Sequence, residues 1–89
     1  EVRAVHDGQV VYADWYKGYG RLVIVDHGEG LYSLYGHLSQ LDVGGGDRVS
    51  RGQVVGLAGD TGSLKGSKLY FEIRRNGEAE DPLLWLAKR

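Results

Sequence analysis

Closely spaced glycines constrain this chain more than any other feature of its sequence. Gly fills 15 of 89 positions, more than twice its usual share of about 7%. Most lie in short turn-like stretches, where Asp-Gly and Asn-Gly pairs supply the positive φ of tight hairpins. These stretches are Asp7-Gly8, residues 17–20, 27–30 and 44–47, Arg51-Gly52, residues 60–62 and Asn76-Gly77. Only short segments remain between the turns, and the sequence predicts strands there.

The segments between the turns alternate in polarity or are rich in β-branched residues, as strands are. The expected strands are Gln9 to Ala13, Leu22 to Asp26, Tyr32 to Tyr35, Val54 to Ala58 and Lys68 to Arg74, with shorter extended pieces at Val2 to Val5 and near Val49. No segment has a sustained helical period, although Pro82 to Lys88, capped by Asp81, could form one helical turn. We therefore expect an all-β fold, a small β-sandwich or open barrel of short antiparallel strands with a groove.

An internal repeat supports two packed hairpins. Residues 5–11 match residues 49–55 at five of seven positions, 44 residues later. Duplicated hairpins can pack face to face, each covering the apolar face of the other. Chance similarity in a Gly-rich chain is the alternative.

The segment from Lys68 to Arg74 has the clearest two-sided pattern. Strict alternation places Leu69, Phe71 and Ile73 on a core face, and Lys68, Tyr70, Glu72 and Arg74 on a polar face. That polar face either lines a groove or is simply solvated. The expected core residues are Leu69, Phe71, Ile73, Leu22, Ile24, Val10 and Val54, with Trp15 and Trp85 as packing anchors.

Length and charge exclude several classes of function. The 89 residues suffice for one domain, 1–89, and a net charge of −1 lacks the basic excess of nucleic-acid-binding proteins. The longest apolar run is the five residues 83–87, too short to cross or enter a membrane. The absence of Cys excludes disulfides and thiolate sites. The absence of Met and a start within a strand pattern suggest the C-terminal fragment of a longer protein.

The three His residues do not form an obvious metal cluster. His6, His27 and His37 are not paired at strand or helix spacing, and zinc catalysis needs about three protein ligands. His37 alone has a plausible role in a site. No Gly-x-Ser-x-Gly elbow and no phosphate-binding loop occurs.

Six ordered motifs carry a family resemblance. They are Val2-Arg-Ala-Val-His-Asp-Gly-Gln-Val10, Gly18-Tyr-Gly20, Val25-Asp-His-Gly28, Leu34-Tyr-Gly-His-Leu38, Gly52-Gln-Val-Val-Gly56 and Leu69-Tyr-Phe-Glu-Ile73. Together they resemble the LytM or lysostaphin-like metallopeptidase family over essentially the whole chain. The resemblance implies a groove in which zinc is held by an upstream His and Asp and by a His of a His-x-His strand.

This chain departs from the family at those ligands. The family's His-Leu-His-Phe-Glu-Ile reads Lys68-Leu-Tyr-Phe-Glu-Ile73 here. A Lys ammonium is repelled by Zn²⁺, and a Tyr phenol with a pKa near 10 is a poor ligand at neutral pH. The resemblance therefore implies a degenerate, non-catalytic member with no metal ligand and no cofactor. His37 occupies the position where active members use a His for proton transfer, and is either a relic or a source of residual chemistry.

Among degenerate members, the sequence from Leu69 to Gly77, with Asp81-Pro82 and Trp85-Leu86, looks most like the murein hydrolase activators. Such proteins bind cell-wall amidases in the periplasm and release an autoinhibitory segment during septum splitting. The resemblance thus implies a periplasmic protein with an amidase partner, and leaves direct peptidoglycan contact open.

In that role the former active-site groove becomes a docking surface. The residues expected to contact the partner are Tyr70, Lys68, Arg74, Tyr35, Tyr19 and His37. Tyr offers a large contact area with a polar tip, and Arg offers forked donors, as is typical of binding hot spots.

Two other functions remain open. An active zinc metalloendopeptidase with unusual ligands predicts stoichiometric zinc. A lipoyl- or biotinyl-like carrier needs a Lys at a hairpin tip, and its loop candidates, Lys17 and Lys65, lack the acidic or Met neighbours expected there.

Overall fold

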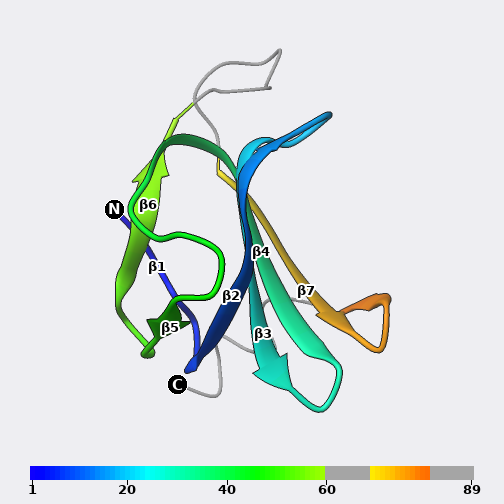
Figure 1. The fold of residues 1–89 in the computed structure, drawn as a ribbon. Coiled ribbons are helices and arrows are strands. Elements are labelled where there is room, and N and C mark those ends of the chain that lie inside the picture. Colours follow the sequence, from blue (N-terminus) through cyan, green and yellow to red (C-terminus); the bar gives the residue numbers. More distant parts are fainter. Residues whose placement is uncertain (60–68, 81–89) are drawn as a thin grey trace.

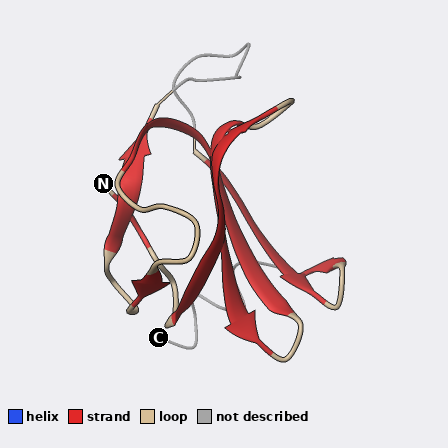
Figure 2. Ribbon diagram, in the orientation of Figure 1, coloured by secondary structure: helices blue, strands red, loops and turns tan. Residues whose placement is uncertain are grey.

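The computed structural model describes residues 1–59 and 69–80, which form eight strands and no helix (Figure 2). The strands are β1 (Val2–Arg3), β2 (Gly8–Tyr16), β3 (Gly20–Gly28), β4 (Leu31–Leu41), β5 (Arg48–Val49), β6 (Val54–Ala58), β7 (Tyr70–Arg75) and β8 (Glu78–Glu80). The expected all-β class is confirmed. Within these ranges there is no helix that could span a membrane.

A single antiparallel sheet curls into two walls because β4 changes partners along its length. The sheet runs β1-β6-β4-β3-β2-β5, while β7 pairs with β4 and β8. The first part of β4, Leu31 to Gly36, pairs with β7, and the part from Leu38 to Leu41 pairs with β6. His37, between the two parts, has a φ of 59°. Figure 1 shows β4 curving over from the wall of β2, β3 and β7 toward β6.

The core fills the space between these walls. Its buried members are Val2, Ala4, Val10, Val23, Val25, Tyr35, Leu38, Val49 and Val55, with Phe71 packed against them. None of the buried members is more than 5% exposed. Each large apolar side chain buried in this way contributes about 1.5–3 kcal/mol to folding.

Each copy of the repeat pairs with the residue just before the other copy. Gln9 pairs with Arg48, and the Ala4 N–H donates to the Gln53 carbonyl at 2.9 Å. Gln53 lies 44 residues after Gln9, and Arg48 lies 44 residues after Ala4. The two contacts are therefore counterparts, and each copy closes one edge of the curled sheet against the other copy.

Several core predictions are confirmed. Val10 and Ile73 are at most 2% exposed, and the half-buried Phe71 packs against the core. Leu22 is 2% exposed and Ile24 is half-buried, but both lie on the opposite face of the sheet, outside the core cluster.

Three core predictions are wrong. Val54 is half-buried because it pairs with the exposed Arg3, while the next residue, Val55, is fully buried. Leu69 is 40% exposed because it precedes β7 at an open hollow. Trp15 is 53% exposed because it lies near the tip of the β2–β3 hairpin, opposite Arg21. Trp85 and the expected helical turn lie outside the described residues.

Candidate functional site

The candidate site lies on the face of β2, β3, β4 and β7 that points away from the core. Directly opposed residues of antiparallel strands project from the same face. Tyr12 is opposite Ile24, Ile24 is opposite Leu34, and Leu34 is opposite Glu72, so these four residues form a row across the four strands. We call the surface built around this row the groove face. It comprises Tyr12, Tyr16, Tyr19, Leu22, Ile24, Leu34, His37, Tyr70, Glu72 and Arg74.

A hollow of about 270 Å³ occupies the groove face. Its lining consists of Tyr12, Tyr16, Tyr19, Leu22, Ile24, Leu34 and Arg74. Leu22 and Leu34 are 2% and 7% exposed although neither belongs to the core cluster, and both line the hollow together with the three tyrosines. The hollow therefore has an apolar floor and a rim of tyrosines with one guanidinium.

The aromatic rings of the groove face form a continuous series. The ring centroids of Tyr12 and Tyr16, and of Tyr16 and Tyr19, are 5.9 Å apart. Tyr19 lies 5.1 Å from Tyr70, which lies 6.1 Å from His37. Aromatic pairs attract one another at such separations. The series thus links the β2–β3 hairpin to β7 and holds the rings in a defined surface.

Gly36 and His37 bring this series together. Gly36 is opposite Tyr70, and a Cβ at Gly36 would lie 3.2 Å from the Tyr70 Cβ and 3.3 Å from the Tyr19 carbonyl oxygen. The absence of a side chain therefore permits the close approach of Tyr19 and Tyr70. The His37 N–H donates to that same carbonyl at 2.6 Å. The positive φ of His37 turns its ring toward Tyr70. With strict strand alternation the ring would instead lie beside Tyr35.

A polar relay runs along β7 at the edge of the groove face. The Tyr70 hydroxyl donates to Glu72 Oε1 at 2.8 Å, and Arg74 Nε donates to Glu72 Oε2 at 3.0 Å. Burial, together with the hydrogen bond to Glu72 and its charge, raises the pKa of Tyr70 to about 12. Tyr70 is therefore a neutral phenol at physiological pH, and Glu72 holds both of its neighbours in place.

The structure brings four of the six expected contact residues together on this face, namely Tyr19, His37, Tyr70 and Arg74. The expectation that Tyr35 contacts the partner is wrong. Tyr35 is 1% exposed and packs against Phe71 on the core face, with a ring-centroid distance of 5.5 Å. The reason is the bend at His37, which separates the two residues onto opposite faces. Lys68 lies outside the described residues.

Sequence reasoning missed the rim residues Tyr12 and Tyr16 and the linking role of Glu72. The register between β2 and β3 was the missing information, because it places Tyr12 opposite Ile24 and next to the hollow. The alternating polarity of β2 could have indicated this face, since Tyr12, Asp14 and Tyr16 recur at every second position.

The donors on β7 do not suit the zinc ion that the family resemblance implies. Zinc takes neutral imidazole, thiolate or carboxylate ligands, whereas the Tyr70 oxygen keeps its proton and donates it to Glu72. Among residues 1–59 and 69–80, no group of three His, Asp or Glu side chains could hold a metal ion.

Comparison with known proteins adds an independent line of evidence. The sequence pattern of peptidase family M23 matches residues 1–82. The chain is 47% identical over 88 residues to the murein hydrolase activator EnvC of Escherichia coli K12, covering 99% of this chain and 21% of EnvC. It is 46% identical over 89 residues to the lipoprotein NlpD/LppB homolog of Pseudomonas aeruginosa, covering 99% of this chain and 30% of that protein. The chain thus spans between a fifth and a third of these relatives.

Solved structures with the same fold include both a peptidase and a protein complex. The catalytic domain of lysostaphin from Staphylococcus simulans superposes with a TM-score of 0.87 at 33% identity, covering 97% of this chain and 69% of that one. A chain of the SpoIIQ–SpoIIIAH pore-forming complex superposes with a TM-score of 0.83 at 36% identity, covering 90% of this chain and 52% of that one. One architecture therefore occurs both in an enzyme and in a protein assembly.

Proposed function

The chain belongs to peptidase family M23, and on that premise we propose that it activates cell-wall N-acetylmuramoyl-L-alanine amidases without cleaving peptidoglycan itself. The proposal also includes its place in the cell: a periplasmic domain, residues 1–89, of a longer protein that acts in septal peptidoglycan splitting. The similarity to an activator over 99% of the chain supports this assignment.

One observation carries the proposal more than any other. At the two sequence positions where an M23 peptidase is expected to present imidazoles, this chain has Lys68 and Tyr70, and the Tyr70 hydroxyl donates a hydrogen bond to Glu72. A water molecule that attacks a peptide bond in such an enzyme needs a bound metal ion, which acts as a Lewis acid and lowers the pKa of that water. Recognition of a partner is the function that the remaining side chains suit.

The groove face supplies the chemistry for such recognition. Its apolar floor, formed by Leu22, Ile24 and Leu34, can take apolar side chains of a partner, and the tyrosine rim offers hydroxyls around it. Aromatic and Arg side chains dominate binding hot spots. We infer that an amidase docks here, through Tyr19, His37, Tyr70, Arg74 and Lys68, and that docking draws its autoinhibitory segment away from its active site.

The test measures amidase activity on purified peptidoglycan with and without the chain. Tyr70→Ala and Arg74→Glu are expected to weaken the apparent affinity for the amidase by about 30-fold or more, because a hot-spot truncation costs roughly 2 kcal/mol or more. Lys68→Glu is expected to act in the same direction. Wild-type stimulation by all three variants would refute the docking site.

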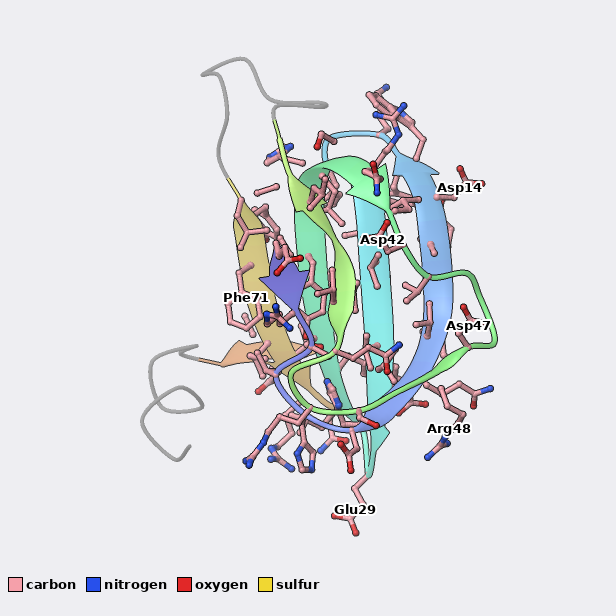
Figure 3. All side chains as sticks on the ribbon, turned by 90° about the vertical axis from the view of Figure 1, so that its left-hand side faces the viewer. Asp14, Glu29, Asp42, Asp47, Arg48 and Phe71 are labelled. Carbon is pink, nitrogen blue, oxygen red and sulfur yellow. The ribbon has the colours of Figure 1, made fainter. Side chains whose placement is uncertain are left out.

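Two matched controls separate docking from general damage. Trp15→Ala removes an exposed ring of the same β2–β3 hairpin that does not line the hollow. Arg48→Glu reverses a charge on the β2 side of the molecule. Figure 3 shows Arg48 on the opposite side from Phe71, which lies on β7. Both variants are expected to stimulate the amidase as the wild type does.

Other results would favour other functions. Zinc bound in one-to-one ratio, with chelator-sensitive cleavage of cross-linked peptidoglycan by the chain alone, would overturn the proposal in favour of a metalloendopeptidase. The relative at 46% identity raises the NlpD-like role as the alternative activator. A panel of the host's amidases distinguishes the two activator roles, because it shows which amidase the chain stimulates.

A further inference from the structure

A hydrogen-bonded chain of side chains crosses the core face, remote from the groove. His27 Nδ1 lies 2.8 Å from the Asp7 carbonyl oxygen, and His27 Nε2 lies 2.7 Å from Ser33 Oγ. Ser33 Oγ lies 2.7 Å from the Tyr35 hydroxyl, which in turn is 3.1 Å from the Val5 backbone nitrogen. Both ends of the chain therefore lie in the segment Val5 to Asp7, and its middle lies on β3 and β4.

The two ends fix the direction of every bond. A carbonyl oxygen only accepts, so His27 Nδ1 must carry a hydrogen, and a neutral imidazole then has a bare Nε2. Ser33 must donate to that nitrogen and accept from the Tyr35 hydroxyl. The Tyr35 oxygen accepts from the Val5 N–H, which can only donate. This arrangement of hydrogens makes all four bonds and also leaves every hydroxyl hydrogen with an acceptor, and it requires neutral His27.

Protonation of His27 breaks this arrangement. Nε2–H must then donate to Ser33, whose hydroxyl has His27 and Tyr35 as its only partners among the described residues. Either Ser33 accepts from both neighbours, or Ser33 donates to Tyr35 and the Tyr35 hydrogen has no acceptor. Ser33 and Tyr35 are 0% and 1% exposed, so water cannot replace the lost partner. In either case one buried hydroxyl hydrogen is left without an acceptor within residues 1–59 and 69–80.

From this geometry we propose that His27 is an acid-sensitive latch that fastens the segment Val5 to Asp7 to the sheet while its imidazole is neutral. Protons can reach the ring, because His27 lines an open hollow of about 340 Å³. The Arg51 N–H also donates to Asp7 Oδ1 at 2.7 Å, so the far end of the segment keeps one attachment when the latch opens.

The charged groups around His27 have opposing effects on its pKa. They are His6 and Asp7 from the N-terminal segment, Asp26 from β3 and Arg48 from β5, while β2 contributes the uncharged Gly8 and Gln9 and β4 the hydroxyls of Ser33 and Tyr35. Burial lowers the pKa of His27 from 6.5, and the nearby His6 lowers it further, against the raising effects of the Asp7 carbonyl and of Asp26 and Asp7. The latch therefore contributes its full stability above pH 6.5 and loses it as the pH falls through the lowered value.

The first test reads the tautomer directly in the wild-type chain. Ring ¹⁵N shifts of His27 above pH 6.5 are expected to show a protonated Nδ1 and a bare Nε2. A protonated Nε2 at that pH would overturn the proposal, since the chain of hydrogen bonds could not then have the inferred direction.

The second test follows hydrogen exchange at the Val5 amide. After correction for the intrinsic rate, exchange is expected to rise about tenfold or more as His27 becomes protonated, because the orphaned hydroxyl weakens the closed state. Ser33→Ala removes the middle link and should abolish this dependence on His27. His6→Gln is the matched control, because His6 lies outside the chain of hydrogen bonds. This variant should keep the dependence of Val5 exchange on the protonation of His27. If the exchange rate of the Val5 amide in the wild type does not change as His27 titrates, the proposal is also overturned.

Discussion

Gly36→Ala is the sharpest single test of how the groove face is built. The added methyl would lie 3.2 Å from the Tyr70 Cβ and 3.3 Å from the Tyr19 carbonyl oxygen. Neither neighbour is the free end of a flexible side chain, so β7 and the β2–β3 hairpin must move apart. Overpacking of this kind costs about 1–2 kcal/mol, which for a chain of this size lowers Tm by roughly 4–16 °C. The movement also weakens the 2.6 Å hydrogen bond from the His37 N–H to Tyr19.

Thermal unfolding and amidase stimulation, both measured on Gly36→Ala, check this reasoning. Stimulation at a temperature well below the new Tm is expected to fall, because Tyr19 and Tyr70 no longer meet. Gly45→Ala is the matched control: a Cβ there has no atom within 4 Å, and removing a glycine from a compatible backbone leaves stability unchanged or raises it by up to about 1 kcal/mol. Equal Tm values for the two variants would refute the idea that close approach at Gly36 shapes the groove face.

Two further predictions concern the core and the phenol on β7. Leu38→Ala is expected to lower the free energy of unfolding by about 2–5 kcal/mol because the side chain is fully buried. Val11→Ala, at a 50% exposed position, should change that free energy by under about 0.5 kcal/mol. Similar urea midpoints for the two variants would contradict the described core. The folded pKa of Tyr70, about 12, lies above its ordinary value of 10, so its neutral phenol contributes stability that is complete below pH 10 and is lost as the pH rises toward 12. The difference in urea midpoint between wild type and Tyr70→Phe should therefore shrink across that range, and a constant difference would count against the raised pKa.

Turn chemistry made most of the fold predictable. The glycine-containing turns divide the chain at the places where its strands end, and β6 runs from Val54 to Ala58 as expected. The family resemblance is confirmed by the M23 match over residues 1–82. β8 was missed, because Glu78 to Glu80 pairs with β7 without any apolar alternation to mark it.

The extent of β4 could not be predicted for a different reason. Gly36 followed by His37 looks like the end of a strand that begins near Tyr32, yet β4 continues to Leu41. Pairing decides this: β6 takes over from β7 as the partner of β4 beyond the bend. The error then carried over to the site, because Tyr35 was expected on the same face as His37. Long-range partners are not visible in local polarity.

His37 has a structural reason to be present that needs no catalysis. Its positive φ ends the pairing with β7, its N–H is bonded to Tyr19, and its carbonyl accepts from the Gly59 N–H at 3.0 Å. His is among the residue types enriched at positive φ, and β-branched residues there are strained. The imidazole adds its contact with Tyr70 to the wall of the groove. Backbone geometry and ring packing together account for this residue, so a His at this position is not by itself evidence for residual hydrolysis.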